Sequence, residues 1–152
     1  MDQTNASLAY IIKDNKILLA KKKVGFAIGK FCSVGGKAEK GESSKQTLIR
    51  EMREEIDVIP SKVNLVANII FNKENKQITN MDVYIVSDFL GQPKETEEVS
   101  PHWFSLDNIP YSHMFPEDAI WLPYVLRGEK IKATFEYKGN FELISYTLEE
   151  LK

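Results

Sequence analysis

The apolar residues of this chain fall into short stretches that alternate with polar, turn-forming segments. Residues 7–23 contain two apolar runs on either side of Asp14 and Asn15, a pair that favours a tight turn. This pattern predicts two strands joined by that turn. Residues 24–42 contain five glycines and no sustained periodicity. We therefore expect that segment to be mostly loop.

The clearest helical pattern lies in residues 43–56, where Leu48, Met52 and Ile56 recur every four residues and so share one face. Residues 63–75 and 77–89 are rich in β-branched side chains, which predicts two paired strands with a turn around Asn75.

The last third of the chain continues this mixture of strands and helices. An acidic loop at 91–100 precedes a short predicted strand at 101–106. Residues 115–128 begin like a helix, with Pro116 in the first turn, and Pro123 is expected to bend or break it. Residues 132–148 predict a closing hairpin around Gly139. The whole pattern indicates one α+β domain, residues 1–152, with a mixed sheet packed between helices.

Composition places the chain among ordinary globular proteins of 152 residues, with 43% hydrophobic and 28% charged residues. A formal net charge of -2 argues against binding to duplex nucleic acid, but not against a small anionic ligand. The one cysteine, Cys32, rules out an internal disulfide. No stretch approaches the roughly 18 apolar residues of a membrane helix, and the start of the chain is not basic. We expect a cytoplasmic monomer without a membrane segment.

Three glutamates crowd the second half of the helix predicted at 43–56. At about 100° per residue, Glu51 and Glu55 lie about 40° apart, with Glu54 on the same arc. A hard divalent cation such as Mg²⁺ or Mn²⁺ would relieve their repulsion. Arg50 is one turn before Glu54 and can pair with it. Taken alone, such a segment is most often a solvated helix face.

The residues before the helix favour the metal site. Gly35 and Gly36 allow a backbone path in which carbonyl groups face a metal, and Glu42 follows a second flexible residue, Gly41. Glycine loop, glutamate and glutamate helix together resemble the Nudix box, G-x5-E-x7-R-E-U-x-E-E-x-G-U, where U is a bulky aliphatic residue. The matching residues are Gly36, Glu42, Arg50, Glu51, Met52, Glu54, Glu55 and Val58.

Asp57 stands where the Nudix family usually has glycine, in a left-handed residue that ends the helix. Because aspartate tolerates that conformation better than most residues, we expect a slightly altered helix exit and retained metal binding.

Nudix enzymes hydrolyse a diphosphate linked to another group, and the resemblance assigns roles to the matching residues. It implies a Nudix-type α/β/α sandwich and metal ligation by Glu51, Glu54, Glu55 and the Gly35 carbonyl. Arg50 would orient a glutamate. Glu98, in the acidic loop, matches a distal glutamate of relatives and becomes a candidate metal ligand or general base; its alternative is a solvated loop acid.

The C-terminal half is similar to the MutT-type branch of the family, which includes 8-oxo-dGTP diphosphatases that sanitise the nucleotide pool and so serve DNA repair. Residues 81–86, 91–123 and 135–150 carry this likeness, which extends from about Ser7 to the end of the chain. It implies a purine pocket walled by Phe26, Phe71, Met81, Phe115 and Trp121, with Glu117 and Asp118 reading the base. Lys22 and Ser7 match further residues near that ligand.

Three residues depart from that branch. Glu117 replaces an aspartate, Phe115 replaces a larger tryptophan, and Cys32 replaces a base-reading asparagine. Cysteine lacks the paired donor and acceptor of an amide, so we expect broader base selection. The alternative for Phe26, Phe71 and Met81 is a place in the core, and for Cys32 that of a small buried hydrophobe.

The resemblance implies a Mg²⁺-dependent pyrophosphohydrolase of purine nucleoside triphosphates, including oxidised ones, that releases the monophosphate and pyrophosphate. A Nudix hydrolase of a nucleotide sugar or dinucleotide remains an alternative. A non-catalytic nucleotide-binding module is disfavoured because every glutamate of the box is present.

Overall fold

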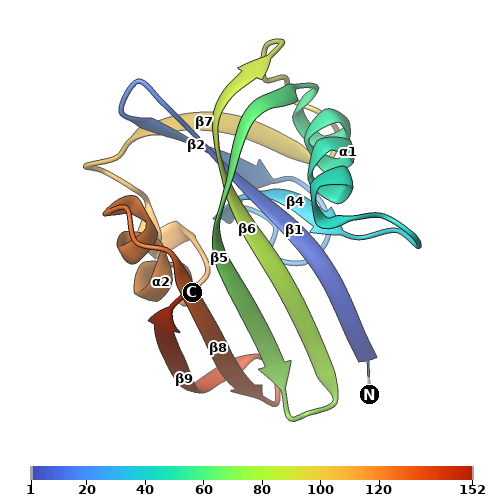
Figure 1. The fold of residues 1–152 in the computed structure, drawn as a ribbon, viewed down its shortest axis with the longest axis vertical. Coiled ribbons are helices and arrows are strands. Elements are labelled where there is room, and N and C mark those ends of the chain that lie inside the picture. Colours follow the sequence, from blue (N-terminus) through green and yellow to red (C-terminus); the bar gives the residue numbers. More distant parts are fainter. Residues whose placement is uncertain (1, 152) are drawn as a thin grey trace.

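The computed structural model describes residues 2–151, which form one mixed sheet with a helix on each side (Figure 1). The helices are α1 (Ser44–Ile56), α2 (Asp118–Leu126) and the short 3-10 helix η1 (Tyr111–His113). The strands are β1 (Asp2–Lys13), β2 (Lys16–Lys22), β3 (Phe31–Cys32), β4 (Val34–Lys37), β5 (Ile59–Lys73), β6 (Gln77–Leu90), β7 (Val99–Ser105), β8 (Ile131–Lys138) and β9 (Glu142–Glu150).

The sheet is mixed, as the sequence predicts. Its main path runs in the order β3-β2-β1-β6-β5-β8-β9, while β4 pairs with β1 and β7 with β2. The pairs β1–β6 and β5–β8 are parallel, and the other pairs are antiparallel. The long strands β1, β6 and β5 are therefore adjacent in the sheet and form its centre, the frame against which both helices pack.

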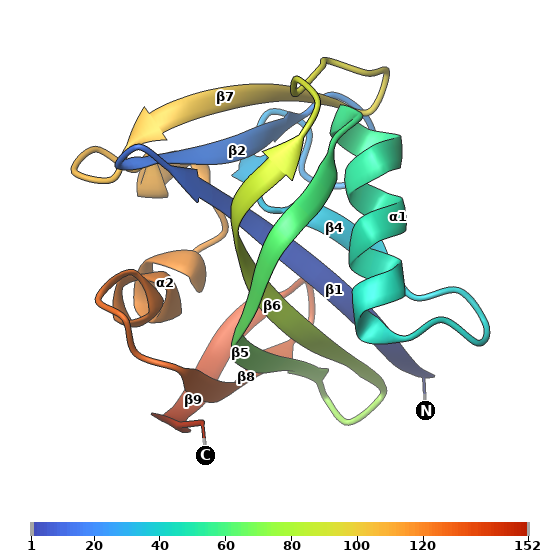
Figure 2. The same ribbon diagram turned by 45° about the horizontal axis from the view of Figure 1, so that its top comes forward.

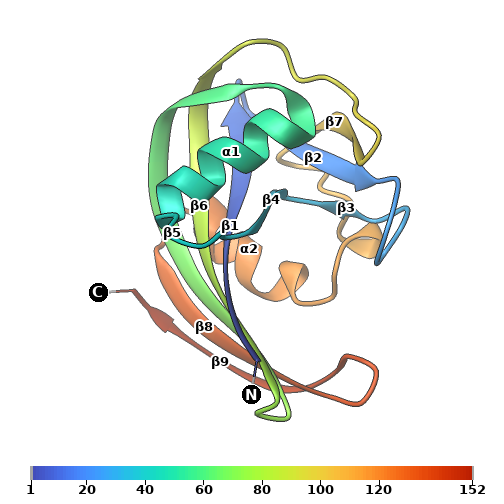
Figure 3. The same ribbon diagram turned by 90° about the vertical axis from the view of Figure 1, so that its right-hand side faces the viewer.

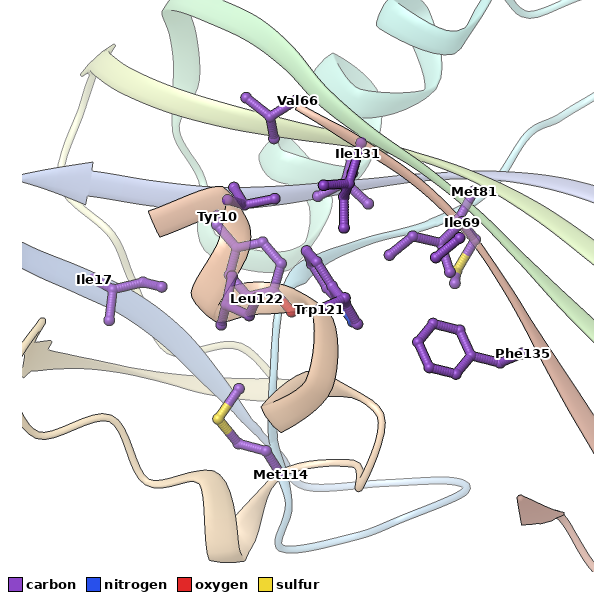
Figure 4. Packing of buried hydrophobic residues seen from close by; sticks show 14 of the residues in the cluster. Tyr10, Ile17, Val66, Ile69, Met81, Met114, Trp121, Leu122, Ile131 and Phe135 are labelled. Carbon is purple, nitrogen blue, oxygen red and sulfur yellow. The ribbon is translucent and has the colours of Figure 1, made fainter. Parts of the chain in front are cut away.

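The two helices cover opposite faces of this frame, and Figure 2 shows β1, β5 and β6 passing between them. Leu48, Met52 and Ile56 of α1 are fully buried against one face, together with Ile11. Because successive strand residues point to opposite faces, the neighbouring Tyr10 enters the other layer. There it packs edge-on against Trp121 of α2, with ring centroids 5.6 Å apart (Figure 4).

The turns and the helix end form where the local sequence predicts them. Asp14 and Asn15 both take positive φ in the turn between β1 and β2, and Glu74 and Asn75 do so between β5 and β6. Asp57 ends α1 in the left-handed conformation, with φ 59° and ψ 43°, so it takes the backbone geometry expected of the family's glycine.

The helix α1 also carries a capping box. Ser43 Oγ accepts a hydrogen bond from the Gln46 backbone N–H, and the Gln46 side chain accepts one from the Ser43 N–H. These reciprocal bonds satisfy backbone groups that a helix start leaves free.

Residues 24–42 are mostly loop, as expected, but they also contain two short strands that the sequence did not indicate, β3 and β4, and β4 runs alongside α1 (Figure 3). These strands form by pairing with β2 and β1, which are distant in sequence, so they have no periodicity of their own. Pro123 was expected to bend or break its helix, and the break is wrong, because α2 continues to Leu126. Proline removes only the one helical hydrogen bond that its own N–H would donate.

Neither α1 nor α2 has the length and apolar composition of a membrane-spanning helix, and the same holds for η1 in the described part of the chain.

Candidate active site

Arg50 lies at the centre of a network of hydrogen-bonded ion pairs along α1. Its Nε and Nη2 donate to the two Glu42 oxygens at 2.7 and 2.9 Å, and its Nη1 donates to Glu51 at 2.9 Å and Glu54 at 3.2 Å. Nη2 also donates to the Lys37 carbonyl at 3.0 Å. These carboxylates raise the pKa of Arg50, and its hydrogen bonds lower the pKa of Glu42 to about 2. Both groups therefore stay charged, and Arg50 fixes the Glu51 carboxylate.

Glu42 joins the loop before the helix to α1. Besides its bonds from Arg50, it accepts hydrogen bonds from the Glu39 backbone N–H at 2.7 Å and from Thr47 Oγ1 at 3.1 Å. One carboxylate thus ties together the loop, the first turn of the helix and the arginine.

Gly36 and Glu51 lie in direct contact. A Cβ atom placed on Gly36 would stand 2.6 Å from the Glu51 carboxyl carbon and from one of its oxygens. That spacing is too short for any side chain. Glycine at this position therefore lets the Glu51 carboxylate lie against the backbone of β4. Burial, the largest cause, raises the pKa of Glu51, as do the charges of Glu54 and Glu98.

Glu55 is the most buried of the three helix glutamates, with 9% of its surface exposed. Its Oε2 accepts a hydrogen bond from the Gly35 backbone N–H at 3.1 Å. Burial raises the pKa of Glu55 to about 8, and the nearby charges of Glu51 and Glu98 add to this rise. Glu98 on the acidic loop is therefore near both helix glutamates.

The carboxylates of Glu51, Glu55 and Glu98 have the ligand chemistry that a hard divalent cation requires. Glu51, Glu55 and Glu98 offer only oxygen ligands, which Mg²⁺ and Mn²⁺ prefer. A bound cation would offset the mutual repulsion that raises the pKa values of Glu51 and Glu55. Between residues 2 and 151, however, no three acidic, histidine or cysteine side chains converge on one point. Glu54 is exposed and pairs with Arg50.

A cavity of about 410 Å³ extends from Glu55 and Gly35 to α2. It gathers most of the residues that the sequence predicts for substrate binding: Lys22, Phe26, Cys32, Phe71, Met81, Phe115, Glu117, Asp118 and Trp121. The glutamate helix and the predicted base site therefore open into the same space.

Aromatic rings surround one end of this cavity. Phe26 and Phe115 stack with centroids 6.2 Å apart and planes at 14°, and Phe141 lies 5.7 Å from Phe26. Phe26 is 67% exposed and Phe141 47% exposed, so flat apolar surface is available to a ligand. Lys30 Nζ lies 5.9 Å from the Phe115 ring centroid.

Two adjacent carboxyl groups lie at the same end. Burial raises the pKa of Asp118 to about 7, and the neighbouring Glu117 charge adds to the rise; burial also raises the pKa of Glu117. Trp121 Nε1 donates to Asp118 Oδ1 at 3.3 Å. Near neutral pH, Asp118 can therefore exist with or without its proton, which allows the pair to offer one donor and one acceptor.

The structure does not bring Ser7 into the cavity. Its neighbours on β1, Leu8 and Tyr10, face the cavity, while Ser7 faces α1 and its hydroxyl donates to the Ser44 carbonyl at 2.8 Å. The alternation of a strand puts Ser7 on the α1 side, beside a smaller polar cavity of about 210 Å³. A direct contact of Ser7 with a ligand in the main cavity therefore does not follow from this structure.

Cys32 lines the cavity as a half-buried thiol. Burial raises its pKa to about 11, so it stays protonated at neutral pH. This fits a small apolar wall residue.

Sequence reasoning missed three aromatic residues of the cavity, Tyr10, Tyr137 and Phe141. The alternating pattern of β8 buries Phe135 and Tyr137 on one face and could have indicated Tyr137. Phe141 lies in the β8–β9 turn with φ 60°, where no periodicity predicts which way a side chain points.

Comparison with known proteins agrees with this geometry. The NUDIX domain family matches residues 2–125. The oxidized purine nucleoside triphosphate hydrolase of Mus musculus is 30% identical over 146 residues, covering 95% of this chain and 94% of that protein. The protein of the same description from Danio rerio is 29% identical over 147 residues, covering 96% and 94%.

Solved structures show the same fold. The MutT protein of Bacillus halodurans superposes with a TM-score of 0.84 at 24% identity, covering 96% of this chain and 97% of that one. The mixed sheet between two helices is therefore the Nudix fold of MutT structures.

Proposed function

This chain belongs to the Nudix hydrolase family, and we propose that it is a Mg²⁺-dependent pyrophosphohydrolase of purine nucleoside triphosphates. Its substrates would include oxidised purines such as 8-oxo-dGTP, and its products would be the nucleoside monophosphate and pyrophosphate. Sanitation of the nucleotide pool, in support of DNA repair, is the role that follows.

One observation carries this proposal: a single cavity joins the aromatic pocket at α2 to Glu55 and Gly35. A purine nucleoside triphosphate has the same two ends, a flat base and a chain of phosphates. The curated relatives that span nearly this whole chain are described as hydrolases of oxidized purine nucleoside triphosphates, which supports the same substrate class.

At the base end, the rings of Phe26 and Phe115 and the thioether of Met81 offer apolar surface to a purine. Stacking of a base on an aromatic ring contributes roughly 1–3 kcal/mol and tolerates different bases. Glu117 and Asp118 supply the polar contacts that choose among them. Lys22 lines the same cavity as Glu55 and would offer a positive charge to the phosphates.

At the phosphate end, Glu51, Glu54, Glu55 and the Gly35 carbonyl would hold the metal. Bound Mg²⁺ would neutralise phosphate charge and lower the pKa of an attacking water. Arg50 holds the Glu51 carboxylate in place, and Gly36 leaves room for it. The charge of Glu98 raises the pKa values of Glu51 and Glu55, which supports a role for Glu98 as an additional ligand or as the general base.

The departures at Cys32, Phe115 and Glu117 point to broad base selection. Cys32 cannot supply the paired hydrogen bonds of an amide, although it lies in the cavity. A site with fewer polar contacts discriminates less between related bases. We therefore expect normal purine nucleotides to be hydrolysed alongside oxidised ones.

A single domain spanning residues 1–152, a monomeric state and a cytoplasmic location belong to the same proposal. They rest on the length, the one cysteine and the charge pattern of the sequence.

The variant Glu55→Gln tests the proposal. The glutamine keeps the shape of the side chain and can still accept the Gly35 hydrogen bond, so the fold should persist. Because an amide is a poor ligand for Mg²⁺, pyrophosphate release should fall by about 100-fold or more. The matched control Glu97→Gln changes an exposed acid of the 91–100 loop and should keep full activity. Undiminished Mg²⁺-dependent turnover by Glu55→Gln would reject the metal assignment.

A further inference from the structure

The acidic loop, which spans residues 91–98 between β6 and β7, lies over the C-terminal end of α1 (Figure 2). The last carbonyl groups of a helix have no partner within the helix and need one from outside it. Here the Lys94 backbone N–H donates to the Ile56 carbonyl, and the Thr96 hydroxyl donates to the Glu55 carbonyl, each at 2.9 Å. The acidic loop therefore caps the helix that carries the Nudix-box glutamates.

Thr96 also closes the turn that contains Glu98. Its backbone N–H donates to the Val99 carbonyl at 3.0 Å, and its hydroxyl oxygen accepts hydrogen bonds from the Glu98 and Val99 N–H groups, each at 3.4 Å. The same hydroxyl thus joins the backbone of Glu98 to the backbone of Glu55. A change that removes this hydroxyl would break the contact between the acidic loop and α1 and loosen the turn at the same time.

Lys23, at the end of β2, holds the same part of the loop. Its Nζ donates to Glu95 at 2.6 Å and to the Thr96 carbonyl at 2.8 Å, and its backbone N–H donates to the Glu98 carbonyl at 2.9 Å. The ion pair with Glu95 is exposed, so we expect it to contribute little to stability. The contacts with the Thr96 and Glu98 carbonyls instead fix the path of the loop backbone immediately before β7.

The path of this backbone decides where the Glu98 carboxylate lies. Val99, the next residue, lines the main cavity together with Glu55. The charge of Glu98 raises the pKa values of Glu51 and Glu55, so the three carboxylates interact. The Glu98 side chain is exposed, and no packing around it holds it in place. Its position relative to the glutamates of α1 therefore depends on how the loop is attached to the helix.

We propose that Thr96 is a positioning residue, whose hydroxyl joins the acidic loop to the end of α1 and so sets the place of Glu98 relative to Glu51 and Glu55 for the hydrolytic reaction. Lys23 assists by fixing the same segment of the loop. Glu98 would act on the metal or on the attacking water, and Thr96 acts only through Glu98. This inference rests on the proposed function and adds to it the contact that aligns two separate parts of the site.

Thr96→Val removes the hydroxyl and keeps the branched shape of the side chain, whereas Thr96→Ser keeps the hydroxyl. Thr96→Val should lower kcat about tenfold, with less than about a twofold change in KM, as expected when a positioning contact is lost. Thr96→Ser should restore kcat to within about twofold of the wild type. Thr147→Val is the matched control, because Thr147 is exposed on β9, and it should leave both constants unchanged. An unchanged kcat in Thr96→Val would overturn the proposal.

A double-mutant cycle with Glu98→Gln tests whether Thr96 acts through Glu98. If it does, Thr96→Val should slow the wild type but not the Glu98→Gln variant, because the carboxylate that Thr96 positions is already gone. An equal loss in both backgrounds would show that the hydroxyl acts on Glu55 or on the helix, and the inference would be wrong. Full activity of Glu98→Gln would also refute it, since no carboxylate would then need to be positioned.

Amide hydrogen exchange of the free protein, without metal or nucleotide, tests the contact independently of turnover. In Thr96→Val the Glu98 N–H loses the hydroxyl as its acceptor and should exchange about threefold faster or more, while Thr96→Ser should match the wild type. Equal exchange rates in Thr96→Val and the wild type would contradict the proposal.

These experiments separate this inference from the proposed function. The cycle runs on whichever nucleotide the wild type hydrolyses, so activity on ADP-ribose alone would reject the proposed substrates while the cycle still decides the role of Thr96. If the wild type hydrolyses none of the nucleotides, the proposed function fails, and the exchange rate of the Glu98 N–H alone decides whether Thr96 holds the loop.

Discussion

At the scale of single residues, burial controls the protonation of the acids that face the cavity. Asp118 and Glu55 carry pKa values of about 7 and 8, against usual values of 3.8 and 4.5, and desolvation is the largest cause for both. The family likeness singles out the 117–118 pair, in which one carboxyl must have a raised pKa if the pair is to offer a donor beside an acceptor. It could not tell which, because burial depends on residues such as Trp121 and Tyr10 that pack from other elements.

The raised pKa of Asp118 predicts how stability changes with pH. Between about pH 4 and pH 7 the folded protein holds the Asp118 proton and the unfolded chain does not, so rising pH lowers the free energy of unfolding. Asp118→Asn removes this titration. The free energy of unfolding of the variant, minus that of the wild type, should therefore increase from pH 5 to pH 8, as measured by urea denaturation.

Asp107→Asn is the control for that experiment, because Asp107 is exposed and its neutralisation should leave the pH dependence of the wild type intact. A difference between Asp118→Asn and the wild type that stays constant across this range would show that Asp118 titrates normally.

At the scale of elements, the close approach of β4 to α1 positions the Glu51 carboxylate. The Nudix box predicts Gly36 from its motif, and the structure supplies the reason, since any Cβ there would overlap Glu51. Gly36→Ala should therefore displace Glu51 and lower kcat by at least about tenfold, while the helix itself stays capped by Ser43. Steady-state kinetics and a thermal melt test this.

Gly41→Ala provides the comparison, because no atom would come within 4 Å of the new Cβ although φ is +84° there. It should lower stability through backbone strain but keep kcat. Equal kcat values for Gly36→Ala and the wild type would show that the contact with Glu51 has no part in catalysis.

The hydrophobic and turn patterns of neighbouring residues predict most helices and strands of this chain. They fail for strands that form only by pairing with strands distant in sequence. The α1 face, its left-handed end at Asp57 and the turn at Asp14–Asn15 follow from neighbouring residues. In contrast, β3 forms by pairing with β2, and β4 by pairing with β1. The residues of β3 and β4 alone do not indicate these pairings.

At the scale of the whole molecule, the Nudix-box helix α1 lies on one face of the sheet, and the aromatic end of the cavity lies beside α2 on the other face. Residues from Leu8 to Leu143 line one cavity, so the site exists only in the complete fold. The motif and the family likeness located most of its lining, from Phe26 to Trp121. They missed Tyr10, Tyr137 and Phe141, and they included Ser7, which faces α1 and not this cavity.

The most direct test of the central claim is pyrophosphate release from a panel of nucleotides with and without Mg²⁺, compared by kcat/KM. The panel contains 8-oxo-dGTP, dGTP, 2-hydroxy-dATP, dATP, dCTP and ADP-ribose. We predict Mg²⁺-dependent release from the normal and the oxidised purine triphosphates, and little from dCTP. Hydrolysis of ADP-ribose without hydrolysis of any purine triphosphate would contradict the account.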